Sequence, residues 1–203
     1  MVTAIMLVVA FSTWTRAGAW QNRLTLADTW LRNHPNSYRS RMTAAGAYAE
    51  SAQSVDLVYD TYVGAAVQNS AAVIPLLEMT KILHSVRLGG LELPRGNTVQ
   101  SANGFAEPLK LSDTWIESTI PALAAEIASR LQDQVVEPGA PHALFDLMSC
   151  AMQGDPVCLE LAPASLHWHR SALDNPRLSE LDRARLENGE GELSRLVSGP
   201  SND

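Results

Sequence analysis

The sequence lacks the short motifs that mark common catalytic and nucleotide-binding sites. No G-x-S-x-G segment, which would place a nucleophilic serine on a sharp turn, occurs in its 203 residues. The phosphate-loop pattern G-x-x-x-x-G-K is also missing, since Gly89-Gly90 is followed by Leu91 without a nearby lysine. We therefore expect a noncatalytic protein that needs no cofactor.

Aromatic residues are few, at 6% of the chain, and strand-like runs of Val, Ile and Thr are nearly absent. Alanine and leucine, which favour helices, are abundant. A chain of 203 residues is long enough for several stacked helical pairs. These observations predict an all-α fold.

The net charge of −7 is spread unevenly along the chain. Five arginines against the single Asp28 give residues 1–41 a charge of +4, so the remainder carries −11. An acidic body argues against a nucleic-acid partner, because phosphate binding needs a basic surface. The basic beginning suits a membrane surface better. The five arginines are Arg16, Arg23, Arg32, Arg39 and Arg41.

Val2–Phe11 is an uncharged apolar run near the start of the chain. A membrane-spanning helix needs about 20 apolar residues, and the run approaches that length only when Thr13–Ala19 is included. We favour a membrane anchor in residues 1–19. Two alternatives stay open: a signal peptide cleaved after Ala17-Gly18-Ala19, although no Lys or Arg precedes the run, and a buried helix.

Residues 35–70 have the spacing of one tetratricopeptide (TPR) repeat. Gly46 and Tyr62 are sixteen residues apart, and Ala65 follows three residues later. Two antiparallel helices approach closely where one presents Gly or Ala and the other inserts a ring. The residues that we expect to pack the two helices are Gly46, Val58, Tyr62 and Ala65.

Helical patterns continue on both sides of this repeat. We expect TPR-like repeats over 20–87, a loop over 88–110, a C-terminal helical region over 111–196 that caps the array, and a disordered tail over 197–203. The expected helices of the second half are a short one from Ser112, a longer one from Pro121 to Gln132, and helices from Pro141, from Pro163 to Leu173 and from Arg177 to Glu187. The fold would be a short α-solenoid of stacked antiparallel pairs, preceded by an apolar helix.

The order of these parts resembles the C-terminal portion of bacterial membrane proteins with TPR repeats, similar to the transmembrane and tetratricopeptide-repeat O-mannosyltransferase-like proteins. The resemblance covers roughly residues 5–190. It includes a Trp20-led half repeat, the Asn33–Ser37 segment NHPNS, one good repeat, and a Cys-containing tail with Asn175-Pro176. In that family a multi-pass glycosyltransferase-like region carries the catalytic acidic residues, and none of them maps onto this sequence. The resemblance implies a repeat domain on the periplasmic side of the bacterial inner membrane, whereas the arginines after the apolar run favour a cytoplasmic side.

Histidine and cysteine side chains offer metal-ligand types without a recognised spacing. His167 and His169 are two residues apart, so on a helix they point in nearly opposite directions and cannot chelate one ion. Cys150, Cys158 and His142 do not match a known zinc pattern. We predict no metal site and keep a small hydrolase or metal enzyme as an alternative.

The only two cysteines, Cys150 and Cys158, lie eight residues apart with Gly154-Asp155-Pro156 between them. This segment should turn the backbone so that the two side chains meet, and the periplasmic location implied by the resemblance would preserve a disulfide. A cytoplasmic location would give two buried free thiols instead.

We expect a membrane-tethered scaffold whose concave groove binds a protein or peptide. First helices of successive pairs line such a groove, which selects Tyr38, Arg41, Tyr48 and Lys81 as partner-binding residues. The alternative is an accessory or remnant domain that acts beside a multi-pass glycosyltransferase-like subunit.

Overall fold

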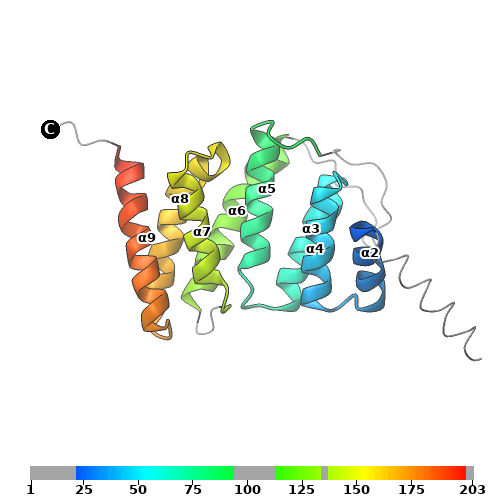
Figure 1. Cartoon of the computed structure of the whole chain (residues 1–203), viewed down its shortest axis with the longest axis horizontal. Coiled ribbons are helices and arrows are strands. Elements are labelled where there is room, and N and C mark those ends of the chain that lie inside the picture. Colours follow the sequence, from blue (N-terminus) through cyan, green and yellow to red (C-terminus); the bar gives the residue numbers. More distant parts are fainter. Residues whose placement is uncertain (1–21, 94–112, 134–136, 200–203) are drawn as a thin grey trace, which may run out of the picture.

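The computed structural model describes residues 22–93, 113–133 and 137–199. All regular structure in these three ranges is α-helical, as predicted. Figure 1 shows that the helices follow one another along the long axis of the molecule, with α2 near one end and α9 at the other. The predicted anchor at 1–19 and most of the predicted loop over 88–110 lie outside the described ranges.

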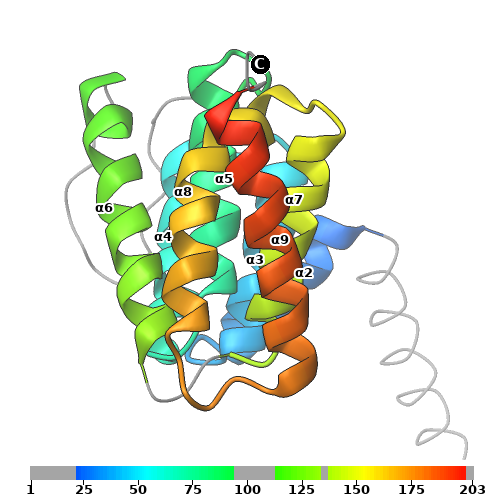
Figure 2. The same cartoon turned by 90° about the vertical axis from the view of Figure 1, so that its left-hand side faces the viewer.

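The helices form successive antiparallel pairs. The bounds are α2 Arg23–Asn33, α3 Tyr38–Glu50, α4 Val55–Gln68, α5 Ile74–Arg87, α6 Asp113–Gln132, α7 Ala140–Met152, α8 Pro156–Leu173 and α9 Glu180–Ser198. Helix α3 packs against α2 and α4, α5 packs against α4 and α6, and α9 covers α7 and α8. Seen along the array in Figure 2, α4, α6 and α8 lie on one side, and α3 and α7 lie on the other.

Short polar residues begin many of these helices. Ser37 and Ser54 each accept a hydrogen bond from a backbone N–H in the first turn of α3 and α4, which satisfies a donor that has no partner within the helix. Pro75 lies in the first turn of α5, where proline costs no helical hydrogen bond. The starts of α3, α4 and α5 therefore follow from local sequence.

The α3–α4 contact is built from small and aromatic side chains. A Cβ atom added to Gly46 would lie 3.9 Å from the Tyr62 hydroxyl, so the glycine of α3 faces the ring of α4. Val58 and Ala65 are fully buried, and Tyr62 is 5% exposed. The structure thus brings Gly46 and Tyr62 together and buries Val58 and Ala65.

The predicted boundaries of three later helices were wrong. Pro121 lies inside a single α6 and Pro163 lies inside an α8 that begins at Pro156. Both prolines are on the exposed side of their helices, while the apolar residues before and after them are buried in one core. Burial on both sides of each proline therefore outweighs the local preference for a break.

Helix α9 begins three residues later than predicted and continues to Ser198. Ser179 caps its first turn by accepting a hydrogen bond from the Asp182 backbone N–H. Val197 and Ser198, predicted to belong to a disordered tail, are helical. No helix of the described ranges is long and apolar enough to cross a membrane.

Candidate functional site

Helix α5 carries a polar stripe toward α7 and α8. Glu78, Lys81, His84 and Arg87 recur at every third residue, so each lies beside the next in a row that winds around the helix. Lys81 Nζ donates to Glu78 Oε1 at 2.7 Å. This polar stripe forms one side of the candidate site.

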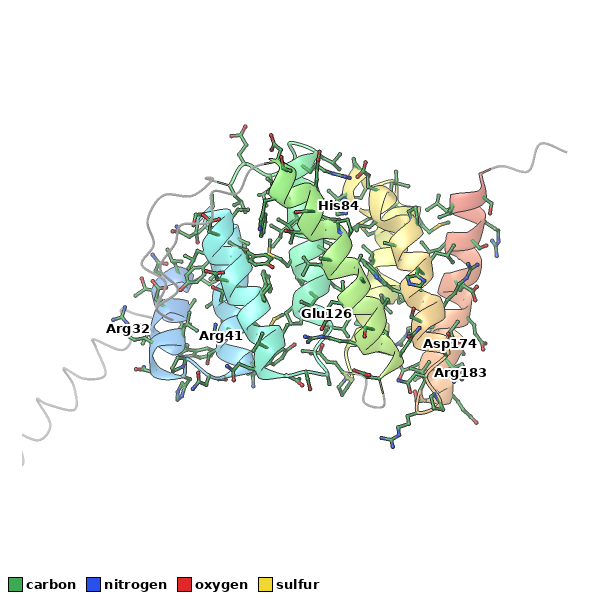
Figure 3. All side chains as sticks on the ribbon, turned by 180° about the vertical axis from the view of Figure 1, so that it is seen from behind. Arg32, Arg41, His84, Glu126, Asp174 and Arg183 are labelled. Atoms are coloured by element: carbon green, nitrogen blue, oxygen red, sulfur yellow. A yellow bond between two sulfur atoms is a disulfide. The ribbon has the colours of Figure 1, made fainter. Side chains whose placement is uncertain are left out.

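His84 and Arg87 meet Glu160 of α8 at one end of the stripe. His84 Nδ1 lies 3.3 Å from Glu160 Oε2 and 3.1 Å from Arg87 Nη2, and Arg87 forms an ion pair with Glu160. Burial, followed by the neighbouring Arg87 charge, lowers the pKa of His84 to about 4. The imidazole is therefore neutral at pH 7, and Arg87 rather than His84 balances the Glu160 carboxylate. Figure 3 shows His84 near the edge of the array opposite to that of Arg183.

A hollow of about 140 Å³ adjoins the stripe where α5 approaches α7 and α8. Its polar lining is formed by Glu78 and Lys81 of α5 and Asp146 of α7, and its remaining wall includes Cys150 and Cys158. Asp146 also lies 3.5 Å from the exposed His142. The hollow is wide enough for one side chain of a partner, and two carboxylates face it against one ammonium group.

A disulfide joins Cys150 near the end of α7 to Cys158 in the first turn of α8, with their Cα atoms 5.8 Å apart. Gly154 turns the chain between the helices with a φ of +84°, which favours glycine. Asp155 then caps α8, because its Oδ1 accepts from the backbone N–H groups of Val157 at 2.9 Å and Cys158 at 3.1 Å. The bond closes the end of the α7–α8 pair beside the hollow.

All four residues expected to contact a partner make a hydrogen bond within the protein, and Lys81 makes its bond to Glu78. Tyr38 donates its hydroxyl to Glu137, and Tyr48 donates to Asp28 at 2.5 Å. Burial, and then each carboxylate partner, raises the pKa of both tyrosines. Tyr48 is only 6% exposed.

Arg41 is 7% exposed, and its Nε donates to the Pro35 carbonyl at 2.8 Å. Its guanidinium also fills the space above Gly64, where an added Cβ would lie 2.2 Å from Nη1. The side chain of Lys81, at the hollow, is 38% exposed. Partner contact by these four residues stays a prediction.

Glu137 is a functional candidate that sequence reasoning missed. It lies just before α7 and is 9% exposed, yet its carboxylate reaches α3 and the start of α5. Its Oε2 accepts from the Val73 and Ile74 backbone N–H groups at 2.9 and 3.0 Å. No local pattern marks a single glutamate in a Glu-Pro-Gly turn as the acceptor for another helix.

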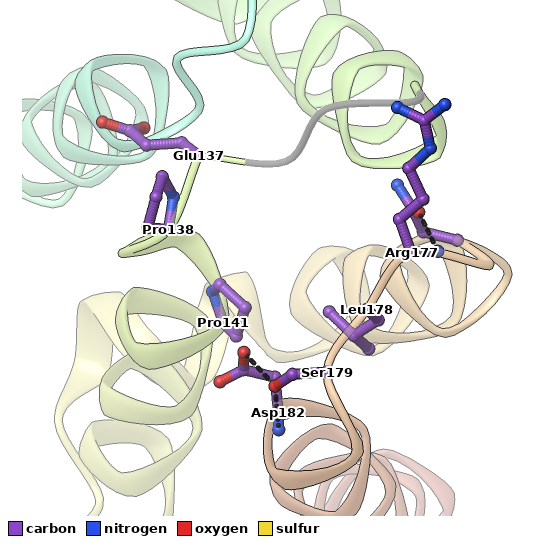
Figure 4. Close-up of a pocket in the computed structure, with 8 residues that line it drawn as sticks. Glu137, Pro138, Pro141, Arg177, Leu178, Ser179 and Asp182 are labelled. Carbon is purple, nitrogen blue, oxygen red and sulfur yellow. Dashed lines mark hydrogen bonds between the residues drawn. The ribbon is translucent and has the colours of Figure 1, made fainter.

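A second hollow, of about 170 Å³, borders Glu137 (Figure 4). Nearby, Asn175 is fully buried and donates to the Leu131 carbonyl at the end of α6, while Arg183 donates to the carbonyls of Leu173 and Asn175. These side chains bind backbone groups at helix ends. The second hollow therefore lies beside a structural joint between α6, α7, α8 and α9.

The two neighbouring histidines of α8 do not share a ligand. His167 is exposed, whereas His169 is fully buried and its Nδ1 donates to the Ser165 carbonyl at 2.8 Å. Burial lowers the pKa of His169. Among the described residues, Cys150, Asp155 and Cys158 place three potential metal-ligand atoms within 4.8 Å of one another.

Comparisons with protein-family models, with curated proteins and with solved structures find no match for this chain.

Proposed function

We propose that the protein is a noncatalytic scaffold that binds a protein or peptide partner through the polar stripe of α5 and the adjoining hollow. The main support for the proposal is the succession of antiparallel helix pairs. This arrangement leaves side chains of α5 and α7 around a hollow of about 140 Å³ that can receive one side chain. Stacking of these pairs as a TPR-like α-solenoid is part of the proposal, supported by the Gly46–Tyr62 contact.

The charges around the hollow favour a basic partner side chain. Glu78 and Asp146 supply two carboxylates, and Lys81 neutralises part of the first one. A lysine or arginine of a peptide would find opposite charge there, in a chain whose net charge is −7. The proposed partner segment is therefore basic.

The tether is the second part of the proposal. The apolar run Val2–Phe11 and the following arginines support attachment to a bacterial inner membrane. The arginines by themselves favour a cytoplasmic array, and we place the array on the periplasmic side because an oxidising compartment preserves the Cys150–Cys158 disulfide. The partner would then be a membrane or periplasmic protein, and a multi-pass glycosyltransferase-like subunit is one candidate.

The test is a pull-down with the full chain from detergent-solubilised membranes, followed by mass spectrometry of the retained proteins. Glu78→Ala with Asp146→Ala removes both carboxylates at the hollow, and Arg195→Ala on the outer face of α9, where this side chain is 74% exposed, is the control. We expect the double variant to lose the partner and the control to retain it. Equal retention by all three proteins, or recovery of the chain in the soluble fraction alone, contradicts the corresponding part of the proposal.

A further inference from the structure

Cys150, Asp155 and Cys158 form a compact cluster at the turn between α7 and α8. One potential ligand atom from each residue lies within 4.8 Å of the others. The two sulfurs are bonded to each other, so in this state neither is a thiolate that can bind a metal. Reduction would release two sulfur ligands next to a carboxylate.

We propose that the reduced α7–α8 turn is a binding site for a thiophilic divalent cation, with Zn²⁺ as the preferred ion. The ligands are the two thiolates and the Asp155 carboxylate, and water completes a tetrahedron. This combination of sulfur and oxygen donors suits Zn²⁺, which binds thiolates at about 2.3 Å and carboxylates at about 2.0–2.2 Å. The inference goes beyond the proposed scaffold, because it assigns a ligand to the disulfide itself.

The backbone around the cluster already positions the three donors. The Cα atoms of the two cysteines are 5.8 Å apart, so both sulfurs can reach one ion without movement of the helices. The Asp155 carboxylate is held by the backbone N–H groups of Val157 and Cys158. Cys158 lies in the first turn of α8, where the helix dipole favours its thiolate form.

A dithiol reductant gives two electrons and two protons to the S–S bond, which breaks into two thiols, and the reductant becomes a disulfide. Zinc binding then displaces one proton from each thiol and forms two Zn–S bonds. A covalent bridge thus holds α7 and α8 together under oxidising conditions, and a metal bridge holds them under reducing conditions.

The site borders the hollow of the candidate surface, because both cysteines line that hollow. Glu78 and Asp146 line the same hollow, and their negative charges favour approach of a cation. Lys81 opposes this attraction in part, since its ammonium group is paired with Glu78.

The experiment uses the full chain, reduced with a phosphine that becomes a phosphine oxide, freed of metal with a chelator and kept under argon. Zn²⁺ is titrated with detection by native mass spectrometry, and Co²⁺ serves as an optical probe for thiolate-to-metal charge transfer. We expect one Zn²⁺ per chain, bound at least about 100-fold more tightly than by the Cys150→Ser/Cys158→Ser variant. The oxidised protein should bind zinc as weakly as the Cys150→Ser/Cys158→Ser variant, because its two sulfurs are joined in the disulfide.

Asp155→Asn separates metal binding from helix capping, because asparagine caps a helix as well as aspartate does but lacks the anionic ligand. We expect its zinc affinity to fall at least about tenfold with helical content unchanged by circular dichroism. The proposal is overturned if the reduced protein binds no more zinc than the double serine variant, if the oxidised protein binds equally well, or if Asp155→Asn keeps full affinity.

Discussion

Gly189 on α9 lies directly against the imidazole of His169 on α8. An added Cβ at this glycine would lie 2.6 Å from Nε2, closer than real Cβ atoms come to other heavy atoms. The ring cannot move aside easily, because it is fully buried and bonded through Nδ1 to the Ser165 carbonyl. The glycine is therefore required for close approach of the two helices.

Gly189→Ala should destabilise the fold by about 1–3 kcal/mol, because the methyl group overpacks the α8–α9 contact. Gly191→Ala is the matched control: nothing lies within 4 Å of its added Cβ, and alanine should gain up to about 1 kcal/mol from helix propensity. Urea denaturation followed by circular dichroism measures both. Equal stabilities of the two variants would show that α8 and α9 are not in close contact at Gly189.

His84 makes stability depend on pH. Its pKa is about 4 in the folded protein and 6.5 as the ordinary value. Above pH 6.5 the imidazole is neutral in both states, and its contribution is fully present. As the pH falls from 6.5 toward 4, the unfolded chain takes up a proton that the folded chain rejects, so stability is lost in this window.

Between pH 7 and pH 5 the His84 contribution should fall by about 1–2 kcal/mol. His84→Gln should reduce this loss, measured as the change in free energy of unfolding between the two pH values. His169 also has a lowered pKa, so part of the pH dependence should remain. His167→Gln, at an exposed position, is the control. If the free energy of unfolding depends on pH in His84→Gln as it does in the parent protein, folding does not lower the pKa of His84.

At the scale of the element, α6 and α8 are helices in which contacts with other helices outweigh the local effect of a proline. Proline inside a helix removes a backbone donor and disfavours continuation, yet α6 continues through Pro121 and α8 through Pro163. The Trp168 indole of α8 is 1% exposed and donates to the Ala124 carbonyl of α6, at 3.0 Å and three residues beyond Pro121. Contacts between the helices thus stabilise the segments that each proline weakens.

Glu137 connects three elements through one carboxylate. Glu137→Ala should cost about 1–3 kcal/mol, because the Val73 and Ile74 N–H groups at the start of α5 lose their acceptor. Thermal or urea unfolding measures the loss. Tyr38→Phe removes only the hydroxyl bond and should cost about 1 kcal/mol.

Glu117→Ala, on the exposed face of α6, is the control for this pair. Because Tyr38 and Glu137 share one bond, their effects should be less than additive in the double variant. Strict additivity would argue that the two side chains do not interact in solution.

At the scale of the whole molecule, the disulfide restrains the unfolded chain. Its loop of eight residues is shorter than the fifteen-residue loop for which about 3 kcal/mol is expected, so reduction should cost about 1–3 kcal/mol. The measurement compares urea midpoints with and without reductant, in the presence of a chelator. The Cys150→Ser/Cys158→Ser variant should not respond to reductant, and a parent protein that also fails to respond would indicate free thiols.

The sequence by itself determined the helical class, the short turns and most helix starts, because these depend on propensity, capping side chains and apolar spacing within a few residues. Ser37, Ser54 and Pro75 are examples. The proximity of Gly46 and Tyr62 could be predicted because the two residues belong to consecutive helices joined by a short turn.

Tertiary structure decided everything that depends on groups far apart in the chain. Tyr38 was expected to line a concave partner-binding groove, but its hydroxyl bonds to Glu137. Glu137 lies 99 residues away in the chain, and no local pattern predicts this bond. Helices α6 and α8 continue through their prolines because distant helices bury the residues on both sides. Local rules give each segment its preference, and the free energy of burying apolar surface across the array decides between preferences that differ by only a few kcal/mol.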